Sequence, residues 1–307
     1  MSNNRRNSLN KSTVRSLLGR VVYSPVVSDY LISQPPEINE NLTFTVDSEA
    51  GQPFAYYAKD IGTYDATIDW GDGTPLQSVT SYNDSNLTHT FPTESLYEVN
   101  ISGSLPSPGV FPAPSSPPSW NNITHVSNLG KLGYENLMFA FASRTSLISF
   151  VSGNTDTSNV EIFSYMFINC NNITNLDVTT MDTSSATTMS GMFNGTLNTD
   201  VDVSNFDTSN VSAFQGMFAN RGPNADVIGL ENFNFESALN MSNFMVNSKL
   251  STSSYDQLLI SISNQNVNQS LNVNFGGSKY TPNSPASVAR NYLINQKNWA
   301  ISDGGPA

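Results

Sequence analysis

The residues of this 307-residue chain that are best suited to chemistry are two histidines, one cysteine and many serines. His89 lies in the strand-like segment THTF, where a structural position is expected, and His125 has no second His, Cys or carboxylate at metal-ligand spacing. Cys170 cannot form an intrachain disulfide and is predicted to be a small core residue. No Gly-x-Ser-x-Gly elbow supports a serine nucleophile. The sequence therefore predicts no catalytic residue and a chain that is not an enzyme.

Two glycine-containing segments have the composition of ligand-binding loops. Residues 69–73, DWGDG, combine carboxylates with turn residues, as calcium sites do, but lack the ligand spacing of an EF-hand loop. A tight turn is the favoured interpretation, and calcium near Asp72 is the alternative. Residues 274–278, NFGGS, lack the lysine of a phosphate-binding loop. We therefore predict no metal site and no cofactor.

The composition is acidic and poor in charge. Lys and Arg total 13 against 25 Asp and Glu, which gives a formal charge of -12, and charged residues make up 12% of the chain. Such a surface repels nucleic acid and anionic membranes. No window approaches the length of a membrane-spanning helix. The composition thus argues against nucleic acid as a partner and against membrane insertion.

The basic residues are concentrated at the start of the chain. The first 28 residues contain no acid and five cations, which are Arg5, Arg6, Lys11, Arg15 and Arg20. We predict that residues 1–36 form an extended basic arm that anchors the chain to other proteins of an assembly, so the chain is expected to be oligomeric there. The alternative is a solvated polar tail.

A repeat of about 26 residues runs through the middle of the chain. The marker residues are Phe141, Phe167, Phe193, Phe218 and Met245. Apolar residues four and seven positions before each marker share one helical face. A short alternating segment follows, as at 176–178 and 201–203, and predicts a strand. Each unit is therefore predicted to consist of a helix, a turn and a strand, and stacking of the units would bury the apolar face of each helix.

The regions on either side of the repeats have different patterns. Residues 37–112 look all-β, with strand-like segments LTFTVD, ATIDW and LYEVNISG. A Pro- and Ser-rich stretch, 104–120, leads into the repeats. Residues 250–307 contain two helical and two strand-like segments. The predicted domains are thus the arm at 1–36, a β domain at 37–112, repeats with their lead-in at 113–249, and a C-terminal cap at 250–307.

The β region resembles the polycystic kidney disease (PKD) domain. The resemblance rests on WGDGT at 70–74, THTF at 88–91 and YEVNISG at 97–103. Phe91 stands where that family has Tyr, and Leu96 where it has Gly. The resemblance implies an immunoglobulin-like β-sandwich that serves as a spacer or adhesion module.

The repeats are similar to BspA-type leucine-rich repeats of bacterial surface proteins. The matching segments are DTSNVEIFSYMFINCNNITNLDV at 156–178, NFDTSNVSAFQGMF at 205–218 and VARNYLINQKNWAISDGG at 288–305. The implied fold class is a multidomain chain: a β-sandwich, then an α/β leucine-rich-repeat solenoid, then an α/β cap. The first repeat is degenerate, and the last lacks the usual Ser-Asn-Val.

The resemblance implies adhesion, and phages carry genes of this type. The first 30 residues have no signal-peptide pattern, so we expect a phage virion protein: a tail appendage, a tail fibre or a capsid decoration that contacts the host surface. The alternatives are a bacterial cell-surface adhesin and an accessory of an extracellular hydrolase.

The candidate binding residues lie on the repeat strands. Alternation directs their polar side chains away from the core, to form an acidic, hydroxyl-lined ridge suited to a host glycan or protein. The ridge residues are Asp177, Thr179, Asp202, Ser204 and Glu231. The alternative is a solvated face.

Overall fold

The computed structural model describes residues 39–49, 51–109, 122–197 and 199–307. The chain divides into two units, Met1–Glu37 and Ile38–Ala307, and the second contains all the described residues. The predicted arm, with its five cations, lies outside the described residues, and so does most of the Pro-rich lead-in.

Six strands form among the described residues before position 110. They are β1 (Leu42–Ser48), β2 (Pro53–Ala55), β3 (Asp65–Asp69), β4 (Gln77–Val79), β5 (Thr88–Thr90) and β6 (Ser95–Ser104), and a 3-10 turn, η1, spans Ser85–Leu87. In β1, Leu42, Phe44 and Val46 are buried, as the alternating sequence requires. Strand β6 pairs antiparallel with β1 and β3, while β2 and β5 form a separate antiparallel pair.

Aromatic side chains from these two sheets meet in one core. Trp70 is fully buried and contacts Phe54 and Phe91 edge-on, with ring centroids 5.9 and 6.1 Å apart. Its indole Nε1 donates to Gln77 Oε1 at 2.7 Å, which satisfies the polar end of the side chain.

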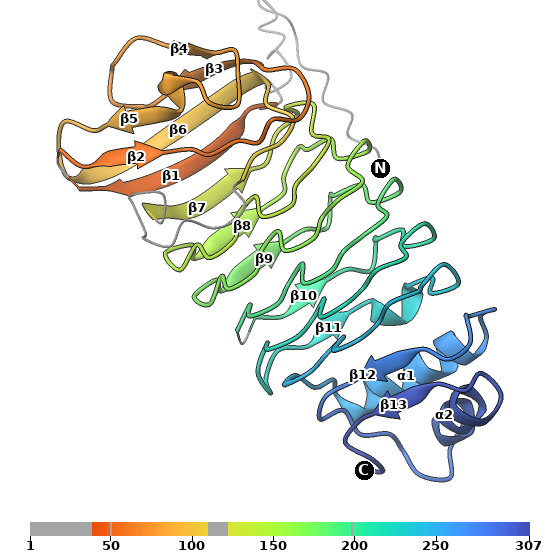
Figure 1. The fold of residues 1–307 in the computed structure, drawn as a ribbon. Helices are drawn as coiled ribbons and strands as arrows, with labels where there is room; N and C mark the ends of the chain where they lie inside the picture. Colours follow the sequence, from red (N-terminus) through yellow and green to blue (C-terminus); the bar gives the residue numbers. More distant parts are fainter. Residues whose placement is uncertain (1–38, 50, 110–121, 198) are drawn as a thin grey trace, which may run out of the picture. The chain divides into compact units, whose positions relative to one another are not determined.

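The main sheet continues from this region into the repeats. Strand β7 (Ile123–Asn128) pairs antiparallel with β1, and β8 (Ser149–Val151) and β9 (Asn175–Asp177) follow in parallel. The result is a mixed seven-stranded sheet with the order β4-β3-β6-β1-β7-β8-β9 (Figure 1). A second parallel pair, β10 (Val201–Asp202) and β11 (Val227–Ile228), follows along the chain.

The predicted fold class, a β-sandwich followed by an α/β leucine-rich-repeat solenoid with an α/β cap, is wrong. The described chain is mostly β, one mixed sheet runs from the first region into the second, and the repeat units contain no helix where one was predicted. The segments expected to be helical, such as 160–167, are successive turns.

Hydrogen bonds between units explain this difference. The Phe167 amide donates to Met192 O at 2.9 Å and the Tyr165 amide to Ser190 O at 2.8 Å. These amides therefore donate to the next unit and not to carbonyls within a helix. Tyr165 and Asn169 also have φ of 61° and 59°, which an α-helix excludes. The apolar residues at i, i+3 and i+7 therefore share a buried face, although the segment that contains them is a run of turns and not a helix.

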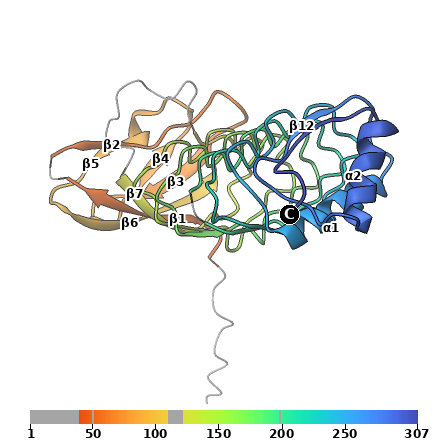
Figure 2. The same ribbon diagram turned by 90° about the horizontal axis from the view of Figure 1, so that it is seen from below.

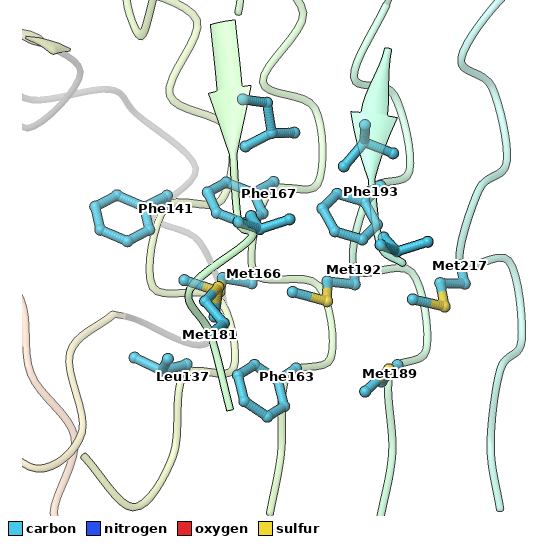
Figure 3. Packing of buried hydrophobic residues seen from close by; sticks show 14 of the residues in the cluster. Leu137, Phe141, Phe163, Met166, Phe167, Met181, Met189, Met192, Phe193 and Met217 are labelled. Atoms are coloured by element: carbon cyan, nitrogen blue, oxygen red, sulfur yellow. The ribbon is translucent and has the colours of Figure 1, made fainter. Parts of the chain in front are cut away.

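Parallel bridges connect equivalent positions of successive units. We call this series the ladder, and its members are Asn136, Ile162, Thr188, Ala213 and Asn240. Beside it the phenylalanine column (Phe141, Phe167, Phe193 and Phe218) fills the interior. Figure 3 shows its first three rings. Successive rings lie 5.8, 5.9 and 5.5 Å apart and within 10° of parallel. The packing of each unit therefore depends on its neighbours.

Two helices follow the last repeat. The remaining elements are η3 (Leu230–Asn232), α1 (Thr252–Ser263), β12 (Asn272–Asn274), α2 (Pro285–Asn295) and β13 (Ala300–Ser302). Ser251 caps α1, and Ser284 forms a capping box with Ser287 at the start of α2. The two helices pack together, as Figure 2 shows. Neither they nor any other described helix is long and apolar enough to cross a membrane.

Candidate binding face

A surface hollow of about 540 Å³ lies over β9 and β10. We call it the acidic hollow, because three aspartates line it: Asp177, Asp200 and Asp202. The other lining residues are Thr174, Asn175, Leu176, Thr179, Thr199, Asn224 and Ile228. Carboxylates, hydroxyls and amides thus surround a single apolar side chain that is strongly exposed, Ile228.

Local hydrogen bonds hold two of the three aspartates in place. Asp177 Oδ1 accepts from the amide and the hydroxyl of Thr179, at 3.0 and 2.6 Å. Asp202 Oδ1 accepts from the Ser204 amide at 2.9 Å, one repeat unit further along. Such Asx turns follow from an Asp two residues before a small polar residue at a strand end.

The third carboxylate links two units. Asp200 Oδ1 accepts from the Asp226 amide at 2.8 Å. Each of the three aspartates therefore uses one oxygen within the protein, and among the described residues the second oxygen has no hydrogen-bond partner. These second oxygens are acceptors for a cation or a hydroxyl group.

The predicted ridge is only partly assembled. Asp177, Thr179 and Asp202 line the acidic hollow, and Ser204 lies beside it through its bond to Asp202. Glu231 lies in η3, outside the hollow, and its carbonyl accepts from the Ser261 hydroxyl of α1. The five anchor cations lie outside the described residues.

Sequence reasoning missed Asp200 and Ile228. Asp200 precedes its strand, so an alternation rule applied within strands does not select it. Its recurrence 26 residues later as Asp226 is the signal that could have found it. Ile228 lies in strand β11, and its side chain is 52% exposed.

The DWGDG segment is a turn in which the Asp72 carboxylate contacts the buried His89 ring. Asp72 Oδ1 accepts from the Thr74 amide and hydroxyl, and Asp72 Oδ2 lies 2.7 Å from His89 Nε2. The two side chains are 1% and 8% exposed. Burial raises the pKa of Asp72, but the hydrogen bonds from Thr74 and His89 outweigh it and leave the pKa below its usual value. Both carboxylate oxygens therefore serve the turn and the strand behind it.

Of the other candidate groups, Cys170 is buried in the core, whereas His125 is exposed on β7. Cys170 is fully buried, its thiol donates to Phe141 O at 3.0 Å, and burial raises its pKa to about 12. This confirms its predicted core position. His125 bonds to the hydroxyl of its neighbour Thr124 at 3.0 Å. Within the described ranges, no three His, Cys, Asp or Glu side chains converge to hold a metal.

The comparison with known families covers the repeat region. Residues 135–258 match the model of a family described as "Mycoplasma protein of unknown function, DUF285". No curated protein and no solved structure matches the chain. The match covers less than half of the chain, and its description assigns no activity. The chain is therefore similar to this family over the ladder, the acidic hollow and the start of α1.

Proposed function

We propose that this chain is a non-enzymatic structural protein of a phage virion that binds a polar partner at the acidic hollow. The observation that carries the proposal is the fixed set of three aspartates on adjacent units, each with one oxygen that accepts from a backbone amide and a second that has no hydrogen-bond partner among the described residues. A tail appendage, a tail fibre and a capsid decoration are the placements that fit this role.

The hollow suits a partner rich in hydroxyl or ammonium groups. Acceptors that are already held by the backbone lose little conformational freedom on binding, so their bonds contribute more affinity. Exposed Ile228 adds an apolar contact at the edge, which favours the face of a sugar ring or an aliphatic side chain. A host surface glycan or protein has both kinds of group.

The charge division of the chain supports a role in an assembly. The first 28 residues contain five cations and no acid, whereas the remainder contains 8 basic and 25 acidic residues. Opposite charges on two parts of one chain allow successive copies, or neighbouring virion proteins, to attract each other.

A bacterial cell-surface adhesin is the second candidate. The acidic hollow would bind in the same way in that setting, so the hollow does not distinguish the two. Antibody labelling separates them, because an adhesin is labelled on intact cells of the producing bacterium and a virion protein is labelled on phage particles.

The binding role is tested by a matched pair of double variants. Asp177→Asn with Asp202→Asn keeps both Oδ1 acceptors and removes two of the three negative charges of the hollow. Asp182→Asn with Asp207→Asn makes the same change at two Asx turns elsewhere in the repeats. Binding of labelled protein to host cells should fall at least about tenfold for the first variant, a loss of ~1.4 kcal/mol, and stay unchanged for the second. Equal binding by both variants would contradict the role of the hollow.

A further inference from the structure

Lys59 lies where the loop after β2 meets the start of the repeats. Ala58 forms an isolated bridge with Pro108, and the Lys59 amide donates to Ser107 O at 2.9 Å. On the other side, the Asn136 amide donates to Pro106 O at 3.3 Å. The segment 106–108 therefore holds Lys59 against Asn136, the first residue of the ladder.

The Lys59 amine is surrounded by neutral oxygen atoms. Nζ lies 3.0 Å from Pro108 O, 3.4 Å from Ser107 Oγ and 3.5 Å from Asn136 Oδ1. Among the described residues, no carboxylate forms an ion pair with it. Burial lowers the pKa of Lys59 to about 8. Roughly a tenth of the molecules then carry a neutral, nucleophilic amine at pH 7, far more than for a solvated lysine of pKa about 10.4.

The Asn136 side chain is held as an electrophile. It is 8% exposed, and its Oδ1 also accepts from the Met138 amide at 2.9 Å. The Met138 amide draws electron density from Cγ through this oxygen and stabilises negative charge that develops on it. Contact between the two side chains replaces a bimolecular encounter with an intramolecular one.

We propose that Lys59 and Asn136 form an intramolecular isopeptide bond. The neutral Nζ attacks Cγ of Asn136, the new Nζ–Cγ amide bond forms, and the Cγ–Nδ2 bond breaks. One proton passes from Nζ to Nδ2, which leaves as ammonia, so no oxidant, reductant or cofactor is needed. The Ser107 hydroxyl, fully buried beside Nζ, is positioned to relay that proton.

The bond would join the β region covalently to the first repeat unit. It closes a loop between residues 59 and 136 and so removes conformational freedom from the unfolded chain. This crosslink is independent of the binding role of the acidic hollow, and it would resist mechanical separation of the two regions.

The test is the intact mass of the purified full-length protein, followed by peptide mapping. We expect the mass to be lower than the sequence mass by one ammonia, and a branched peptide that links Lys59 to Asn136. Lys59→Arg, whose side chain stays protonated, should have its full sequence mass. Ser107→Ala should slow formation of the bond.

Asn240→Ala is the matched control. Asn240 is also a member of the ladder. Its Oδ1 accepts from the Ser242 amide at 3.0 Å, in the same way as Asn136 Oδ1 accepts from the Met138 amide. This variant should keep the branched peptide. Wild-type protein with its full sequence mass, and with Lys59 and Asn136 on separate linear peptides, would refute the proposal, whether or not the variants fold.

Discussion

At the scale of single residues, Asp72 joins the DWGDG turn to strand β5. Its carboxylate accepts from Thr74 within the turn and pairs with His89 across the core, and the His89 ring stacks on Trp70 at 4.8 Å. The sequence predicted the turn from Asp and Gly. It could not predict the pairing with His89, because that contact depends on how two distant segments pack.

Replacing Asp72 by Asn should destabilise the protein. The substitution keeps the acceptor for Thr74 but removes the charge beside His89, a change worth about 1–2 kcal/mol of unfolding free energy. The folded-state pKa of Asp72 lies below 3.8, so its ionised form stabilises the fold above about pH 4, and this contribution is lost as the pH falls through the folded value. The free energy of unfolding of the wild type, measured in urea, should therefore fall more steeply with decreasing pH than that of the variant. Parallel pH curves would disprove this assignment.

Gly191 is the second residue whose type is fixed by its surroundings. It has φ of 62°, and a Cβ there would lie 2.4 Å from the Tyr165 ring, whereas Gly73 has φ of 84° and no atom within 4 Å. Gly73→Ala should cost only the backbone strain, ~1–2 kcal/mol. Gly191→Ala should cost ~1–3 kcal/mol more through overpacking.

A double-mutant cycle isolates the clash at Gly191. When Tyr165→Ala is introduced first, Gly191→Ala should cost no more than Gly73→Ala, as measured by the free energy of unfolding. The same cost in both backgrounds would mean that Tyr165 does not cover Gly191.

At the scale of elements, the repeat unit is a set of turns bonded to its neighbours. The sequence correctly indicated the strand segments LTFTVD, ATIDW and LYEVNISG, which form β1, β3 and β6. The helix predicted in each repeat unit was wrong, because the same apolar spacing occurs in a helix and in a run of turns. The positive φ of Tyr165 and Asn169 and the hydrogen bonds between units exclude a helix. Neither feature can be predicted from the sequence of a single unit.

Removal of one ring from the phenylalanine column should destabilise several units together. Phe193 is fully buried and stacks on Phe167 and Phe218 at 5.9 and 5.5 Å. Phe193→Ala should lower the free energy of unfolding by ~3–5 kcal/mol through the cavity it leaves. Leu239→Ala is the control, since Leu239 is 69% exposed and should change stability by at most ~0.5 kcal/mol. Equal effects at both positions would show that the column does not support the repeats.

At the scale of the whole molecule, charge is the property that the sequence predicts most directly. It predicts the acidic character of the chain, and three of the five residues predicted for the ridge line one hollow in the structure. It could not predict the hollow itself, which needs Asp200 from one unit and Asn224 and Ile228 from the next. Such convergence depends on the register between units, which is set by packing.

Deletion of residues 1–28 should separate folding from assembly. Ile38–Ala307 is a compact unit by itself, so the shortened protein should unfold with the same midpoint as the full chain. It should no longer be incorporated into particles, because the deletion removes all five cations of the arm. Added salt should weaken association of the full-length protein, since exposed charges are screened beyond ~10 Å at 0.1 M. Full incorporation of the deletion variant would place the anchor elsewhere.

The most direct test of the proposed function is quantitative mass spectrometry of gradient-purified virions released from cells that encode this chain. A structural virion protein should be present in a constant ratio to the major capsid protein through successive purification steps, and antibodies should label the particles. Its absence from the particles, with labelling of intact bacterial cells instead, would contradict the virion assignment and favour the adhesin.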